Sequence, residues 1–64
     1  MRWVFIVSRG STIEKVKVFD DYFEGEFYTN EYLRIGFGVV DFPEYRKGEY
    51  YQSGISVGLY KDNG

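Results

Sequence analysis

Residues 32–42 read YLRIGFGVVDF and residues 54–60 read GISVGLY. In both stretches small residues alternate with large apolar ones, which is the period of a β-strand with two different faces. Glycine weakens a strand, so its repetition at alternate positions indicates close approach by a ring, a backbone or a ligand. We therefore predict one sheet face with a floor of small residues, which we call the glycine face. Its floor consists of Gly36, Gly38, Gly54, Ser56 and Gly58.

The other side of the same strands predicts the core. The residues between the glycines are large and apolar, and they would all project away from the glycine face. A further strand over residues 22–28 would add two phenylalanines to this side, and the N-terminal strand would add two more rings. The predicted core is Trp3, Phe5, Phe23, Phe27, Leu33, Ile35, Phe37, Val39, Ile55, Val57 and Leu59.

The N-terminal part of the chain predicts a β-hairpin. Two strands, residues 2–8 and 12–19, flank a turn at Gly10-Ser11, where glycine supplies the positive φ of a type II′ turn. A regular ladder from this turn would set Phe5 opposite Val16. The lysines of the second strand would then lie on the opposite, solvated face and protect an edge.

Strand one is apolar on both faces. Val4 and Ile6 point away from the side that carries Trp3 and Phe5. One layer of structure cannot bury both sides of a strand, so either the sheet closes on itself or a second copy covers it. We predict self-association into a dimer or higher oligomer.

The fold class predicted from these patterns is all-β. Asp20-Asp21 and Pro43 separate the strands, which gives a five-stranded antiparallel meander as a strongly bent sheet or a small barrel of SH3-like or OB-like shape. Residues 1–64 form a single small domain, with a polar end at residues 61–64 that we expect to fray.

Composition argues against catalysis and against metals. The 64 residues contain no cysteine and no histidine, so thiolate and imidazole chemistry are excluded and the usual metal ligands are missing. No phosphate-binding loop or other catalytic motif stands out. We predict a non-enzymatic protein without a cofactor.

Charge and hydropathy favour a protein partner. The net charge is −2, and electrostatic binding of nucleic acid or an anionic membrane calls for a basic patch. The acidic residues between positions 20 and 31 are interpreted as a solvated face, and the alternative is a mimic of nucleic-acid phosphates or a contact for a basic partner surface. The apolar run Trp3–Val7 is shorter than a signal peptide's core or a membrane helix, which predicts a cytoplasmic protein with no membrane contact.

Tyrosine is the second feature of the glycine face. Its rings offer a large contact area with a polar group and are enriched at interfaces. We predict the binding residues Tyr22, Tyr28, Tyr32, Gly36, Gly38, Tyr50, Gly54, Ser56, Gly58 and Tyr60. Two alternatives stay open: a ring of the same chain could cover the glycines, or the glycines could serve a bend or a positive φ.

The predicted function is a small binding module that acts by surface contact with a protein partner or with its own copies. Chains of this size and composition are often inhibitors or adaptors, many of them virus-encoded. One alternative is a nucleotide or single-stranded nucleic-acid binder that stacks bases on Tyr50, Tyr51, Tyr28 or Trp3, with Arg46 and Lys47 on phosphates. Another is a structural subunit of a larger assembly.

Overall fold

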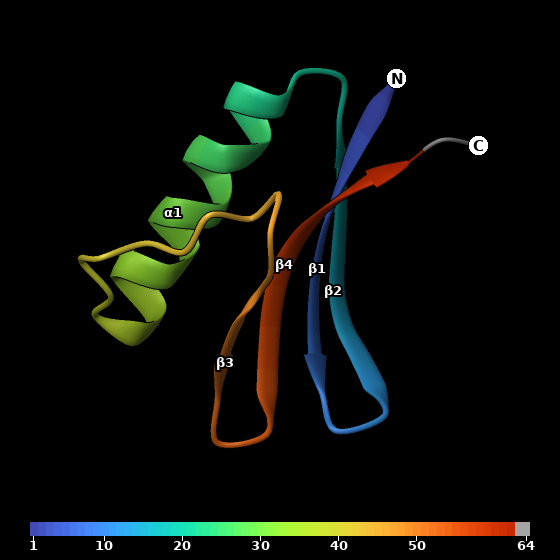
Figure 1. Cartoon of the computed structure of the whole chain (residues 1–64). Coiled ribbons are helices and arrows are strands. Elements are labelled where there is room, and N and C mark those ends of the chain that lie inside the picture. The colour runs from blue at the N-terminus through green and yellow to red at the C-terminus, as the bar shows by residue number, and fades with distance from the viewer. Residues whose placement is uncertain (63–64) are drawn as a thin grey trace.

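A computed structural model describes residues 1–62 as one open, antiparallel sheet with a single helix packed on it (Figure 1). Two hairpins lie side by side, and the N-terminal strand of the first pairs with the C-terminal strand of the second, so that the edges of the sheet are β2 and β3. The elements are β1 (Arg2–Arg9), β2 (Thr12–Phe19), α1 (Tyr22–Phe37), β3 (Tyr50–Gln52) and β4 (Ile55–Asp62), and the strand order is β2-β1-β4-β3.

The predicted all-β class is confirmed only in part: the domain is mostly β and antiparallel but contains one helix, and the five-stranded meander and the barrel are not confirmed. One strand was expected over about residues 49–60, where β3 and β4 form a hairpin with a turn at Ser53 and Gly54. Two strands were expected in residues 22–37, where one helix forms. Both ends of this helix are capped. The Asp21 carboxylate accepts a hydrogen bond from the Glu24 amide at 3.1 Å, and Gly38 adopts the left-handed conformation at φ 70°. The amides of Gly38 and Val39 then donate to the last carbonyls of the helix.

Two glycines at the end of α1 have opposite roles, and this supports a prediction. Gly36 lies inside the helix and has open space where an added β-carbon would lie, so Gly36→Ala is expected to stabilise the fold by about 0.5–1 kcal/mol. Gly38→Ala would force a β-carbon into the left-handed region and is expected to cost about 1–2 kcal/mol. Urea denaturation midpoints of the two variants check the pair. Equal shifts of both midpoints in the same direction would contradict the assignment of Gly38 as the cap of the helix.

The helix approaches the sheet closely at Gly25. A β-carbon on this residue would lie 2.9 Å from Leu59 Cδ1 and 3.4 Å from Phe19 Cδ2. Beside this contact, the rings of Tyr28 and Tyr32 stand edge-on to Phe5, with centroids 5.1 and 5.2 Å away. The buried apolar core is Phe5, Val7, Tyr22, Leu33, Tyr45, Val57 and Leu59.

The helix changes which of the predicted core residues are buried. Phe23 and Phe27 are about two-thirds exposed and Ile35 is 74% exposed, because they lie on the outer side of α1. Inside, the helix presents Gly25 and Thr29 to the sheet, and the Thr29 hydroxyl donates to the Gly25 carbonyl at 2.7 Å. The predicted assignment of Phe23, Phe27 and Ile35 to the core is therefore wrong, since helical spacing turns them outward. The rest of the predicted set is buried or packed against the core.

The segment between α1 and β3 closes one side of the core. Tyr45 is buried, and its hydroxyl donates to Asn30 Oδ1 at 2.6 Å. The Arg46 guanidinium lies over the Tyr22 ring, 3.9 Å from its centroid. The partners of both contacts, Asn30 and Tyr22, belong to α1, so the segment is packed against the helix.

The ladder between β1 and β4 reaches the polar C-terminal end. Lys61 and Asp62 belong to β4 and pair with β1, and Asp62 forms an ion pair with Arg2 at 3.6 Å. Fraying of residues 61–64 stays a prediction. Residues 63–64 lie outside the described part of the chain.

Candidate functional site

A β-bulge in the first hairpin determines which side chains the open side of the sheet carries. The turn at Gly10-Ser11 forms as predicted, but the register shifts by one residue between Val7 and Ser8. Beyond the bulge Val16 pairs with Ile6 and Val18 pairs with Val4. A one-residue shift moves every side chain of a strand to the other face.

The bulge therefore corrects the predicted hairpin. Phe5 lies opposite Lys17 and not opposite Val16, so the lysines share the helix side with Phe5 and Val7. Val16 and Val18 join Val4 and Ile6 on the side away from α1. Among residues 1–62, no helix or strand is layered on that side (Figure 1). We call it the uncovered face.

The uncovered face is apolar across the three long strands. One row carries Val18, Val4 and Tyr60, and the next carries Val16, Ile6 and Gly58. Val16 and Val18 are 54% and 50% exposed, and Val4 and Ile6 remain partly exposed. A sheet normally buries such a face against another layer. At one end of the face, Ile13, Ser8, Ser56 and Tyr51 complete a third row.

Tyr60 shapes the centre of this face. Its ring folds back over Gly58, so that a β-carbon there would collide with the ring. Its hydroxyl donates to the Glu49 carboxylate. Hydrogen bonds from Tyr60 and Ser56 lower the pKa of Glu49, while burial and the neighbouring Glu49 raise the pKa of Tyr60 to about 12. Between the tyrosine and the third row lies a shallow hollow of about 540 Å³.

The charges on the uncovered face are already compensated. Arg2 and Asp62 pair with each other at its end, and Glu49 is hydrogen-bonded by Tyr60. The two central rows contain only apolar side chains, glycine and Tyr60. The face can therefore be covered without burying an unpaired charge.

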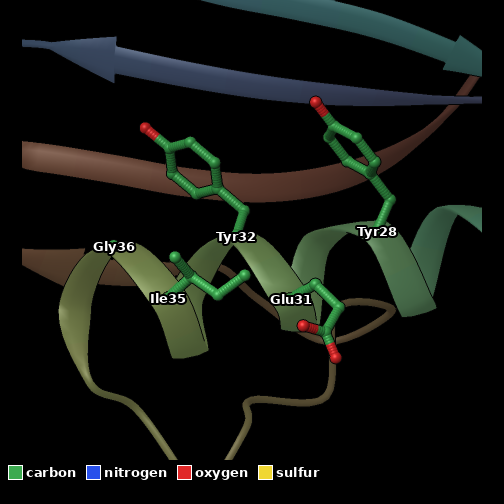
Figure 2. A pocket seen from close by; sticks show the side chains of 5 residues that line it. All are labelled: Tyr28, Glu31, Tyr32, Ile35 and Gly36. Carbon is green, nitrogen blue, oxygen red and sulfur yellow. The ribbon is translucent and has the colours of Figure 1, made fainter.

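A second surface lies on the helix side, between α1 and the edge strand β2. Tyr28, Tyr32, Ile35, Gly36 and Glu31 line a hollow of about 320 Å³ there. Figure 2 shows the two tyrosine rings rising from α1 toward the strands, while the Glu31 carboxylate points away from the strands. Lys15 Nζ lies 5.6 Å from the Tyr32 ring centroid and Lys17 Nζ lies 4.6 Å from that of Tyr28. We call this surface the edge groove.

The ten predicted binding residues do not share one sheet face, because half of them belong to α1 or its cap. Tyr22 is buried in the core, and Tyr50 packs against Phe37 on the helix side. Tyr28, Tyr32 and Gly36 line the edge groove, and Gly38 caps α1. The uncovered face carries Ser56, Gly58 and Tyr60.

The glycines of the predicted face do not have one common reason to be glycine. Gly54 has φ 81° in the β3–β4 turn, and Gly38 caps the helix, so both require positive φ. Gly58 is covered by Tyr60 of the same chain. Gly36 meets neither condition. The common floor inferred from alternation is therefore wrong, whereas the alternative of a covering ring holds at Gly58.

Of the residues of the nucleic-acid alternative, Trp3 and Arg46 line one hollow, with the guanidinium 6.0 Å from the Trp3 ring centroid, and the tyrosines lie elsewhere. Arg46 stacks on Tyr22, and Tyr28 packs against Phe5 and Phe19. Tyr50 and Tyr51 project to opposite sides of β3. No specific observation favours base stacking.

The described residues, 1–62, hold no group of three or more acidic, histidine or cysteine side chains placed to bind a metal ion. Within the same residues, α1 is too short and too polar to cross a membrane. Comparisons with protein-family models, with curated proteins and with solved structures found no match to this chain.

Proposed function

We propose that the chain is a small, non-enzymatic protein-interaction module that acts as a dimer, with the uncovered face as the contact between two copies. The observation that carries this proposal is the exposure of Val16 and Val18 beside Val4 and Ile6, on a sheet whose other side is covered by a helix. Burial of apolar surface is the main driving force of association.

The size of the face supports a second copy as its occupant. Three strands of eight residues make a surface of roughly 26 by 14 Å, and the three residues of β3 widen it at one end, which gives about 400 Å² in projection. Its accessible area is larger, because the side chains roughen it. Stable interfaces bury roughly 600–1,000 Å² on each partner, so the whole face has to be covered. A flat partner of the same dimensions achieves this, and a second copy is such a partner.

The chemistry of the face fits the same occupant. Two sheets pack face to face about 10 Å apart through interdigitating apolar side chains. The central rows bring no charge into that layer, so two identical faces can meet without repulsion. The product would be a four-layer arrangement of helix, sheet, sheet and helix. In that dimer α1 stays outside, free to meet the partner of an adaptor or inhibitor.

Mass in solution tests the proposal. At micromolar concentrations sedimentation should show twice the 7.6 kDa chain mass. Val16→Glu places a carboxylate in the contact of both copies and is expected to weaken the dimer by about 100-fold or more. Phe27→Glu is the matched control, since Phe27 is 69% exposed on α1 and away from the sheet.

The two variants carry the same added charge, so a difference between them locates the contact. A dimer in Phe27→Glu and a monomer in Val16→Glu, with unchanged circular dichroism in both, is the expected result. A wild-type monomer throughout the micromolar range overturns the proposal, as does loss of the dimer in Phe27→Glu alone. Association that responds little to salt agrees with an apolar contact and disagrees with nucleic-acid binding.

A further inference from the structure

The edge groove combines a free strand edge with an apolar hollow. Within residues 1–62, β2 pairs only with β1, so between Lys15 and Phe19, outside the bulge, every second residue turns its amide and carbonyl away from the sheet. All of β2 except Phe19 is exposed. Above this edge, α1 presents Tyr28, Tyr32 and Ile35, of which Ile35 is 74% exposed.

We propose that the edge groove binds an extended acidic segment of a partner protein, which adds to the sheet as a strand beside β2. In such strand addition the main-chain hydrogen bonds supply affinity and the alternate side chains supply specificity. The groove lies on the helix side of the sheet and the dimer contact on the other. This binding therefore goes beyond the dimer and does not depend on it.

The charges around the groove select an acidic segment. Two carboxylates on the elements that form the groove are already paired: Glu31 forms an ion pair with Arg34 at 2.5 Å, and Glu14 forms one with Arg9 at 2.5 Å. Within residues 1–62, Lys15 and Lys17 take part in no ion pair and contact aromatic rings only. A carboxylate on an added strand, directly opposite a lysine, makes a favourable cross-strand pair.

The same lysines argue against a second copy in this position. When two antiparallel β2 edges pair about Val16, Lys15 of one copy lies opposite Lys17 of the other. Pairing about either lysine sets that lysine opposite itself. Like charges directly opposite each other destabilise a ladder. In these registers the edge disfavours its own copy, whereas a strand of opposite charge meets no such repulsion.

Because the hollow of the edge groove is lined by Tyr28, Tyr32 and Ile35, we expect one apolar side chain on the added strand. α1 runs antiparallel to β2, so that Tyr28 lies near Lys17, Tyr32 lies near Lys15, and Ile35 lies further toward the Gly10 turn. Side chains of the strand that face α1 would therefore be acidic, acidic and apolar in sequence. Its other side chains face away from α1 and are less constrained.

A synthetic peptide tests this. The probe is a capped heptapeptide, Thr-Glu-Thr-Glu-Thr-Leu-Thr, titrated into the whole chain and followed by amide chemical shifts. Shifts are expected along β2 and on Tyr28, Tyr32 and Ile35. Lys15→Gln with Lys17→Gln should weaken binding roughly 10-fold. The charge-matched control, Lys47→Gln with Lys61→Gln, changes lysines away from the groove and should bind as the wild type does.

Methylation of the peptide amides separates strand addition from simple charge attraction. Two peptides carry N-methyl groups on alternate amides, one on each set. Only one set can face β2, so one peptide should lose at least about 10-fold in affinity while the other binds almost normally. Equal behaviour of the two sets, equal weakening by both lysine pairs, or no binding by the unmodified probe overturns the proposal.

Discussion

Phe5→Ala is expected to remove a large part of the folding stability of the chain. Phe5 is fully buried in β1 and receives the edges of the Tyr28 and Tyr32 rings. Loss of a buried phenylalanine costs about 3–5 kcal/mol, and the total stability of a 64-residue domain is only about 3–10 kcal/mol. Urea denaturation followed by circular dichroism measures the loss.

Phe27→Ala is the matched comparison for Phe5→Ala. Phe27 has the same side chain but is 69% exposed on the outer side of α1, so the change is expected to stay within about 0.5 kcal/mol. The comparison separates the helix from a strand at residues 22–28, where Phe27 would have joined the core. Equal destabilisation by both substitutions would contradict the orientation of α1.

The second large effect is a loss of stability in alkaline solution. Burial raises the pKa of Tyr45, and burial together with Glu49 raises that of Tyr60 to about 12. Burial and the hydrogen bond to Glu26 also raise the pKa of Tyr22. In the unfolded chain a tyrosine ionises near pH 10.

A raised pKa means that the folded state prefers the neutral phenol. The contribution of these tyrosines is therefore complete below about pH 10 and is lost as the pH rises through their folded values. Each tyrosine kept neutral removes at most about 1.4 kcal/mol for each pH unit above 10. Unfolding free energies measured from neutral pH to about 12, with phenolate absorbance as a second signal, test this. Tyr45→Phe should flatten the decline, and a constant stability over the range would refute the expectation.

The first hairpin could be predicted from sequence because its turn signal is local, whereas the second hairpin was missed, since residues 49–60 were expected to form one strand. Gly10-Ser11 fixed the first turn, and the alternation of residues 55–59 correctly placed Val57 and Leu59 in the core. The bulge at Val7 and Ser8 could not be predicted in the same way. It has no sequence signature here, yet it moves Val16 to the other face. With the bulge, Lys15 and Lys17 lie on the helix side, over the rings of Tyr32 and Tyr28.

The helix did carry local signals, although its apolar pattern concealed them. Asp21 followed three residues later by Glu24 is a helix start, and Gly38 is a helix end. The apolar spacing pointed elsewhere, because the buried side of α1 uses Gly25 and Thr29 while Phe27 lies outside. Alternation of large and small residues near the helix end then resembled a strand. Here the capping residues were better evidence than hydrophobic period.

The apolar pattern of strand one predicted part of the uncovered face, whereas the tyrosine and glycine pattern did not. Strand one was apolar on both sides, which correctly predicted that Val4 and Ile6 face away from Phe5. The tyrosine and glycine set depended on two strands that do not form. Only its β4 members lie on the uncovered face.

Contact between copies through the uncovered face can be measured directly in a mixed sample, where one half of the chains is labelled with carbon-13 and nitrogen-15 and the other half is not. Isotope-filtered nuclear Overhauser spectra then report only contacts between copies. The account predicts such contacts from the methyl groups of Ile6, Val16 and Val18. Contacts confined to Phe23 and Phe27, or none while the sample sediments as a monomer, would contradict it.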